Sequence, residues 1–229
     1  NSATVAWMGM AIYPTAVVVS PAMSSDSCGP TTNPDILAGL NPDPNDRDAD
    51  LVAAANNINS RVQSAALTAV GGTPTANSLK FFGSYGPLLA PDRPNFVLLL
   101  TDGLPNCNNN NPNTCANPTT CRCTTGACTM APNDTGFCVR GCLDKDESEF
   151  QVRELRKKNI RTIVVGFGAD TAMGDGPDTL NTLAEAGGFP RSCDLGMTCS
   201  AGDTCDGVTK LCGKKFYQAT SATELAAAL

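Results

Sequence analysis

The amino-acid sequence predicts an α/β fold with a doubly wound, mostly parallel open sheet and two disulfide-rich loop insertions. Nearly continuous apolar runs alternate along the chain with segments of helical periodicity. The cysteines cluster in stretches that match neither pattern. Parallel strands covered by helices on both faces have this signature, and their connections are right-handed crossovers.

The first apolar run, residues 4 to 13, predicts a central strand. After Pro14, the β-branched run from Thr15 to Ser20 predicts an antiparallel edge strand that is joined to the first by a tight turn. Apolar residues then recur at helical spacing from Leu51 to Val70, and Gly71-Gly72 ends the predicted helix.

Asp46, Asp48 and Asp50 precede this helix at the spacing of calcium-loop ligands. However, Leu51 stands where such a loop needs glycine, and Asn57 stands where it needs glutamate. Carboxylates at a helix N-terminus interact favourably with the helix dipole, and we expect this role instead.

A short helix is expected over residues 79 to 82, and Phe96 to Leu100 predicts a second buried strand that ends at Thr101-Asp102-Gly103. The next helix begins with the acidic residues Asp144, Asp146 and Glu147 and ends with basic residues at 156 to 158, before Asn159. This order of charges suits the helix dipole.

Ile160 to Phe167 predicts a third buried strand, and Leu180 to Ala186 predicts a helix that Gly187-Gly188 ends. Lys215 to Tyr217 is expected to form a last strand. A capping box, Ser221-Ala-Thr-Glu224, then starts a final helix.

Two stretches interrupt this alternation and match neither helix nor strand. We call residues 103–143 the first insertion and residues 190–212 the second insertion. Because the first insertion begins directly after Asp102, we expect it on the rim of the sheet where the strands end. It could determine which partner fits there, or it could be a flap that protects against proteolysis.

The cysteines predict disulfides and an extracellular, cell-surface or periplasmic location. The twelve are Cys28, Cys107, Cys115, Cys121, Cys123, Cys128, Cys138, Cys142, Cys193, Cys199, Cys205 and Cys212. The alternative is zinc, because Cys123 with Cys128 and Cys138 with Cys142 have the spacing of paired thiolate ligands. A zinc site would use four thiols and would leave the others unexplained.

The number of cysteines in each stretch constrains the disulfide pairing. The first insertion holds seven cysteines and the second holds four, so at least one bond must leave the first insertion if all twelve pair within the chain. Cys28 is the simplest partner. Alternatively, Cys28 bonds the second insertion, which in turn bonds the first.

Charge and composition exclude several classes of function. The 229 residues suffice for one domain, and the net charge of −6 argues against nucleic acid as a partner. No apolar run is long enough to span a bilayer, so we expect no membrane insertion by this chain. The absence of histidine rules out Ser-His-Asp and Cys-His nucleophiles, and we expect a protein that is not an enzyme.

Two loop motifs become specific when they are considered together. Gly71-Gly72-Thr73-Pro74-Thr75 precedes a helix, and Thr101-Asp102-Gly103 ends an apolar strand about thirty residues later. With the strand 160–168 and the closing segment 216–225 behind them, these motifs resemble the von Willebrand factor type A (VWA) family. The resemblance covers the chain except the two insertions. It extends to the Cys-rich versions of this domain in secreted and lipid-anchored proteins of myxobacteria.

The resemblance implies a metal-ion-dependent adhesion site (MIDAS) on top of the sheet. In the family, an Asp-x-Ser-x-Ser run, a loop threonine and an aspartate hold a divalent cation. The threonine corresponds to Thr73 and the aspartate to Asp102. Their hard oxygen ligands suit Mg²⁺, Ca²⁺ or Mn²⁺, and an open coordination position accepts an acidic oxygen from a protein partner.

The sequence departs from the family pattern in one respect: it contains no Asp-x-Ser-x-Ser run. Ser24-Ser25-Asp26-Ser27 has suitable residue types but the wrong position. The family order places the run before residue 1, so the resemblance implies a single VWA-like domain over residues 1–229 that lacks its first strand and helix. With only Thr73 and Asp102, we expect bound metal in this chain alone to be weak or absent.

Ordinary structural roles for the two residues stay open at this stage. Thr73 could cap the following helix, and Asp102 could accept backbone N–H groups in a tight turn. The leading hypothesis is a metal-dependent extracellular adhesion module. The alternative is a structural or assembly subunit of an extracellular fibre or envelope complex, in which the metal site is incomplete or unused.

Overall fold

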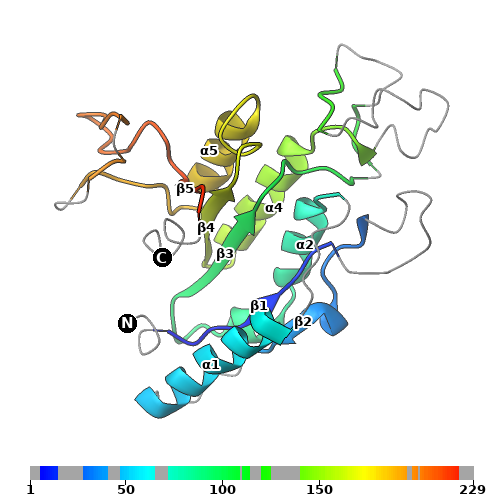
Figure 1. The fold of residues 1–229 in the computed structure, drawn as a ribbon, viewed down its shortest axis with the longest axis vertical. Coiled ribbons are helices and arrows are strands. Elements are labelled where there is room, and N and C mark those ends of the chain that lie inside the picture. The colour runs from blue at the N-terminus through cyan, green and yellow to red at the C-terminus, as the bar shows by residue number, and fades with distance from the viewer. Residues whose placement is uncertain are drawn as a thin grey trace.

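A three-stranded parallel sheet forms the centre of the structure (Figure 1). Strand β3 (Asn95–Thr101) pairs with β4 (Ile160–Phe167) along its whole length, and β4 pairs with β5 (Tyr217–Ala219). This computed structural model describes residues 6–14, 28–40, 47–64, 72–108, 110–113, 120–124, 140–194, 198–200 and 202–221. The predicted strands 96–100 and 160–167, and their parallel arrangement, are confirmed.

Helices α2 (Thr75–Phe82), α4 (Lys145–Lys157) and α5 (Gly176–Ala186) pack beside the sheet, with α4 between the other two (Figure 1). Helix α4 is amphipathic. It buries Val152 and Leu155, three residues apart on one face, and leaves most of its charged side chains at least partly exposed.

One face of the sheet and these helices enclose the hydrophobic core. Its buried residues are Leu79, Leu88, Leu99, Val152, Leu155, Ile160, Val164, Leu180, Leu183, Ala184, Ala186 and Phe216. On the opposite face of β3, Phe96, Leu98 and Leu100 are exposed. The structure therefore establishes a mixed α/β fold with a small parallel sheet, and the doubly wound arrangement remains a prediction.

The described part of the first apolar run, residues 6–13, does not join the parallel sheet, contrary to the prediction of one sheet for all the apolar strands. Within it, only β1 (Met10–Ala11) is a described strand, and it pairs antiparallel with β2 (Ile36–Ala38), which the sequence analysis missed. Strand β1 thus obtains its backbone hydrogen bonds from β2, and no described strand links it to β3.

Side chains tie this small two-stranded sheet to the rest of the molecule. Thr31 is buried, its N–H donates to the Ser78 hydroxyl of α2 (3.1 Å), and its own hydroxyl donates to the Ile12 carbonyl (3.0 Å). Tyr13 and Leu40 pack against the core. Residues just after β1 and β2 therefore lie beside the main core even though the strands belong to another sheet.

Helix α1 (Asp48–Ser64) contacts β2 and lies at the lower edge of the molecule in Figure 1. Asp48 and Asp50 lie in its first turn, and Asp50 forms an ion pair with Arg47 (2.6 Å). These carboxylates therefore occupy the N-terminal helix positions that the sequence analysis favoured over a calcium loop.

Several predicted boundaries are wrong by a few residues. Helix α2 starts at Thr75 instead of 79, and α5 starts at Gly176 instead of 180, with Pro177 in its first turn, where proline is well tolerated. The last strand starts at Tyr217 instead of Lys215, because the Lys215 N–H donates to the Asn181 side chain (2.7 Å).

Two short 3-10 helices, η3 (Asn33–Asp35) and η4 (Gly86–Leu89), complete the described elements. The predicted edge strand 15–20 and most of the predicted final helix, from residue 222 on, lie outside the described residues. None of the helices in the described ranges combines the length and the hydrophobicity that crossing a bilayer requires.

Candidate metal site

Thr73 and Asp102 come together at the carboxyl edge of the parallel sheet. Asp102 and Gly103 directly follow β3, and Thr73 lies on the loop that leads into α2. The Thr73 Oγ1 atom lies 3.1 Å from the position that a Cβ atom on Gly103 would take. The Thr73 hydroxyl is therefore a close neighbour of the Asp102–Gly103 peptide.

Neither side chain is engaged elsewhere in the described part of the chain. Asp102 is exposed and forms no hydrogen bond or ion pair there, and the Thr73 hydroxyl forms none either. Pro74 occupies the N-cap position of α2, which has no side-chain cap. The Thr101 hydroxyl accepts from the Gly103 N–H (3.4 Å) and donates to the Gly103 carbonyl (2.9 Å), so Thr101 provides hydrogen-bond partners for the backbone of this turn. Among the described residues, Thr73 thus forms no helix cap and Asp102 accepts no backbone N–H group.

A buried tyrosine hydroxyl lies close to this rim. The Tyr13 hydroxyl faces the side chains of Thr75 and Thr101, but it forms no hydrogen bond of ordinary geometry within the part of the chain that the structure describes. Burial raises the pKa of Tyr13 to about 12, the two threonines partly offset this increase, and the negative charge of Asp102 adds to it. Tyr13 therefore stays neutral near pH 7.

Asn106 connects the Thr73 loop with the first insertion, although it belongs to none of the sequence motifs. Its side-chain Oδ1 accepts from the Thr73 N–H (2.6 Å), and its backbone N–H donates to the Thr73 carbonyl (2.9 Å). Four consecutive asparagines follow at residues 108 to 111, so another asparagine at 106 is not distinctive in the sequence. The signal available in the sequence was its place four residues after Asp102, behind Pro105.

Four disulfides join cysteines of the described ranges, and no cysteine in these ranges is free, while Cys115, Cys128 and Cys138 lie outside them. They join Cys28 with Cys107, Cys121 with Cys142, Cys193 with Cys205, and Cys199 with Cys212. Cys28 thus bonds the first insertion, and the second insertion pairs within itself. Cys123 is also disulfide-bonded. The zinc alternative is wrong for Cys123 and Cys142, because an oxidised sulfur is not a thiolate ligand.

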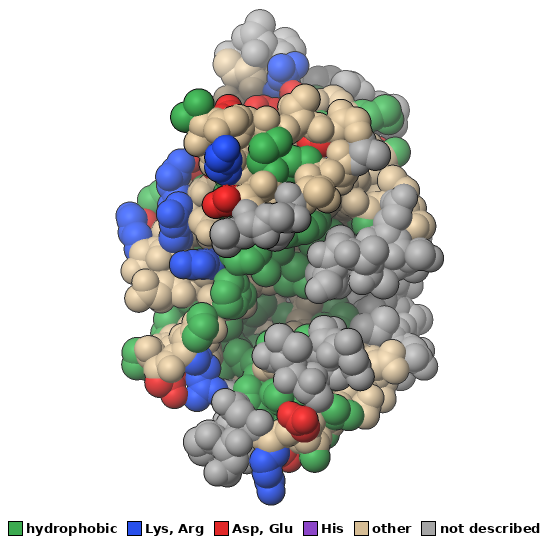
Figure 2. All heavy atoms as spheres, turned by 90° about the vertical axis from the view of Figure 1, so that its left-hand side faces the viewer, with side chains coloured by type: hydrophobic (Ala, Val, Ile, Leu, Met, Phe, Trp, Pro, Cys, Tyr) green, Lys and Arg blue, Asp and Glu red, His purple; other side chains and the backbone are tan. Residues whose placement is uncertain are grey.

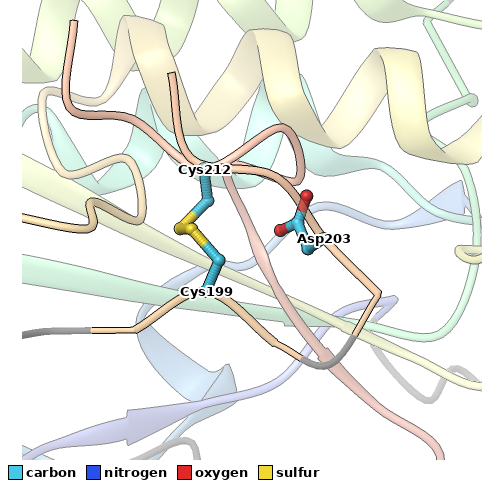
Figure 3. Close-up of side chains that lie close together, drawn as sticks. All are labelled: Cys199, Asp203 and Cys212. Carbon is cyan, nitrogen blue, oxygen red and sulfur yellow. A yellow bond between two sulfur atoms is a disulfide. The ribbon is translucent and has the colours of Figure 1, made fainter. Parts of the chain in front are cut away.

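A second group of potential metal ligands lies in the second insertion. Cys199, Asp203 and Cys212 offer atoms within 4.8 Å of one another, but the two sulfurs are bonded to each other (Figure 3). The Asp203 carboxylate accepts backbone N–H groups from Thr204 (2.9 Å) and Lys214 (3.1 Å). This group is therefore a structural cross-link.

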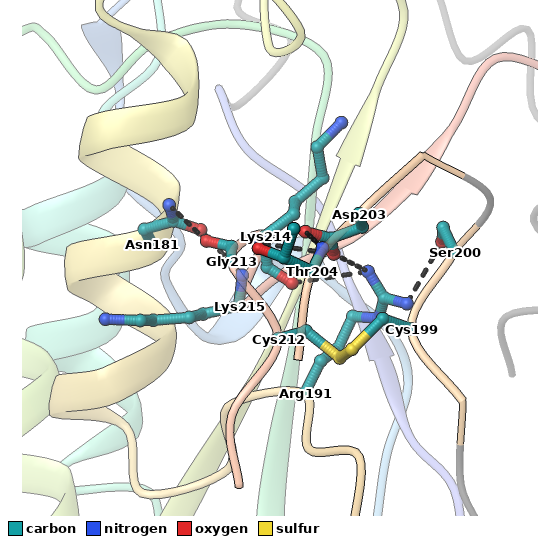
Figure 4. Close-up of polar contacts among 10 residues, drawn as sticks. All are labelled: Asn181, Arg191, Cys199, Ser200, Asp203, Thr204, Cys212, Gly213, Lys214 and Lys215. Carbon is teal, nitrogen blue, oxygen red and sulfur yellow. Dashed lines mark hydrogen bonds and ion pairs between the residues drawn. A yellow bond between two sulfur atoms is a disulfide. The ribbon is translucent and has the colours of Figure 1, made fainter. Parts of the chain in front are cut away.

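Arg191 links the second insertion to the end of the sheet (Figure 4). Its guanidinium donates to the Lys214 carbonyl (3.2 Å) and the Ser200 hydroxyl (3.0 Å), and it lies 3.6 Å from the Asp203 carboxylate. It also lies over the ring of Tyr217 in β5, 5.6 Å from the centroid. These contacts hold the second insertion rigidly against β5 and leave the Thr73 and Asp102 side chains uninvolved.

The donor atoms at the rim fit a hard divalent cation. One hydroxyl and one carboxylate oxygen suit Mg²⁺, Ca²⁺ or Mn²⁺ better than a soft-ligand metal, and Mg²⁺ commonly binds through one or two carboxylates while it keeps several waters. Two protein ligands support weak binding only. Comparisons of the chain with protein-family models, with curated proteins and with solved structures give no match.

Proposed function

We propose that the chain is a metal-dependent binding module of the VWA type that works outside the cytosol. Thr73 and Asp102 contribute to a MIDAS-type site, and the site engages an acidic group of a protein partner. One observation carries the proposal. The Thr73 hydroxyl lies beside the Asp102–Gly103 peptide at the carboxyl edge of a parallel sheet, where ligands of such sheets gather, and neither this hydroxyl nor the Asp102 carboxylate forms a hydrogen bond or ion pair within the described residues.

Electrostatics favours a cation in this role. The chain carries a net charge of −6, so an acidic partner is repelled at long range. A bound divalent cation supplies local positive charge and open coordination positions for an outside carboxylate. The disulfides support an extracellular or periplasmic setting, because such bonds persist in oxidising compartments.

Binding of Mn²⁺ tests this proposal directly. Electron paramagnetic resonance measures free Mn²⁺ during titration of the chain, and weak binding that Mg²⁺ displaces is expected. Asp102→Ala should abolish it, and Thr73→Ala should weaken it less, because threonine is a neutral ligand. Asp170→Ala is the matched control, since Asp170 is an exposed aspartate shortly after β4 at the same edge. Equal binding by the wild type and Asp102→Ala would refute the proposal.

A second candidate function, a structural or assembly subunit, is favoured by the edge of the sheet. Strand β3 pairs with β4 alone among the described strands, and its outer face exposes 39% of Phe96, 46% of Leu98 and 44% of Leu100. Figure 2 shows hydrophobic side chains gathered in a hollow on the left-hand side of Figure 1. Soluble proteins usually protect a long apolar edge strand.

The occupant that fits such an edge is a β-strand from a neighbouring subunit, because it supplies backbone partners together with apolar side chains. Sedimentation equilibrium distinguishes the two candidates. Self-association that survives chelation of divalent cations and is lost in Leu98→Lys supports the assembly role. A monomer at all concentrations would count against it.

A further inference from the structure

One residue of the first insertion holds both backbone polar groups of Thr73. Asn106 is 4% exposed. Its Oδ1 accepts from the Thr73 N–H at 2.6 Å, and its own N–H donates to the Thr73 carbonyl at 2.9 Å. The Thr73 hydroxyl has no hydrogen bond of its own within the described residues, so the backbone sets its position.

The remaining donor of Asn106 reaches the far end of the first insertion. Its Nδ2 donates to the Thr124 hydroxyl (2.8 Å), which in turn donates to the Gly141 carbonyl (2.9 Å). The buried amide thus uses its oxygen toward the Thr73 loop and its nitrogen toward the insertion. A displacement of the insertion near Thr124 would therefore act on the Thr73 backbone.

Close packing prevents this connection from shifting. A Cβ atom on Gly72 would lie 2.7 Å from Asn106 Oδ1 and 2.2 Å from the Cys107 sulfur, so only glycine allows the loops to approach this closely. The Cys107 sulfur is itself fixed by its disulfide to Cys28. The Thr73 loop and the beginning of the first insertion therefore form one rigid unit.

We infer that Asn106 is a positioning residue for the candidate metal site and couples the first insertion to it through Thr73. The inference rests on the proposed function. Groups that orient metal ligands typically change metal affinity by about 10- to 100-fold when they are removed. Asn106→Ala should therefore weaken Mn²⁺ binding by about tenfold.

The test is a double-mutant cycle on Mn²⁺ affinity, with thermal stability measured in parallel. If Asn106 acts through Thr73, Asn106→Ala weakens binding in the wild type and has no further effect in Thr73→Ala. Asn111→Ala is the matched control. Asn111 is also a buried asparagine of the first insertion, but it donates to the Leu143 carbonyl (3.0 Å) and forms no hydrogen bond with Thr73. It should lower stability and leave Mn²⁺ affinity within about twofold of the wild type.

Thr124→Val provides a milder variant if Asn106→Ala does not fold. It removes only the hydroxyl that the Asn106 amide contacts, and a severalfold loss of Mn²⁺ affinity is expected. Equal losses in Asn106→Ala and Asn111→Ala, additive losses in the cycle, or unchanged affinity in Thr124→Val would overturn the inference alone. Equal Mn²⁺ affinity in the wild type and Asp102→Ala would overturn the proposed function as well.

Discussion

Asp144 is a buried carboxyl group with one unsatisfied oxygen. Its side chain lies at the N-cap of α4, where Asn108 of the first insertion donates to Oδ1 (2.9 Å) and Oδ2 has no hydrogen-bond partner among the described residues. Burial raises its pKa to about 6, and the charges of Glu147 and Asp146 act in the same direction, while the Asn108 hydrogen bond opposes the increase.

This raised pKa predicts that stability falls as the pH rises. Between the ordinary pKa of 3.8 and the folded value of about 6, the folded state binds the proton more tightly than the unfolded state does. The wild type should therefore lose up to about 3 kcal/mol from pH 4 to pH 7 through this group. Asp144→Asn should lack this slope, and Asp146→Asn, which removes only the smallest of the contributions that raise this pKa, should keep most of it. Urea unfolding at each pH measures the effect, and parallel profiles for the wild type and Asp144→Asn would contradict it.

Gly72 and Gly103 lie on the two loops of the candidate site, but alanine should affect them differently. At Gly72 the new methyl group would meet the Cys107 sulfur at 2.2 Å, a contact that must be relieved by moving a disulfide. At Gly103 it would meet only the Thr73 hydroxyl at 3.1 Å. Gly72→Ala should cost about 1–3 kcal/mol or more, and Gly103→Ala about 1 kcal/mol or less. Denaturant unfolding of both variants checks this order; equal costs would show that the loops are not rigid.

The sequence predicted the pair of residues but not the residue that holds one of them. Thr73 and Asp102 could be found because each belongs to a motif with a fixed relation to a helix or a strand. Asn106 could not, because its role depends on a contact across 33 residues of chain. Only its place four residues after Asp102, behind Pro105, separates it from the other asparagines of the first insertion.

At the scale of elements, the length and apolar content of a strand decide whether the sequence predicts it. Strands β3 and β4 are long and apolar, so the pattern identified them and their parallel pairing. Strands β1 and β2 are two and three residues long, and no periodicity is readable over such lengths. Because β3 is apolar at every position from 96 to 100, its sequence did not indicate that one face of the strand is exposed.

Substitution of the neighbouring leucines of β3 should therefore destabilise the protein to very different extents. Leu99 is 4% exposed in the core, and Leu98 points to the open face. Leu99→Ala should cost about 2–5 kcal/mol, while Leu98→Ala should cost about 1 kcal/mol or less. Thermal unfolding of both variants measures the difference. A large cost at Leu98 would mean that another part of the protein covers this face in solution.

At the scale of the whole molecule, disulfides connect parts that backbone hydrogen bonding leaves separate. Cys28 precedes β2 of the two-stranded sheet, and Cys107 follows β3 of the parallel sheet. The two disulfides of the second insertion instead close short local loops. The cysteine counts required only that at least one bond leave the first insertion, and identifying its partner required the spatial position of residue 28.

Removing one long-range disulfide and one local disulfide in separate variants should affect stability and Mn²⁺ affinity differently. The Cys28–Cys107 bond spans 79 residues, and loop-closure entropy gives it about 4 to 5 kcal/mol, against about 3 kcal/mol for Cys193–Cys205, which spans 12. The Cys28→Ala/Cys107→Ala variant should therefore be the less stable one in urea unfolding. It should also bind Mn²⁺ more weakly, because it removes the Cys107 sulfur that packs against Gly72 beside Thr73. Cys193→Ala/Cys205→Ala should leave Mn²⁺ affinity unchanged, because no contact among the described residues joins this disulfide to the Thr73 loop or the Asp102 loop. If both variants lose affinity in proportion to their loss of stability, the Cys28–Cys107 bond has no specific connection with the candidate metal site.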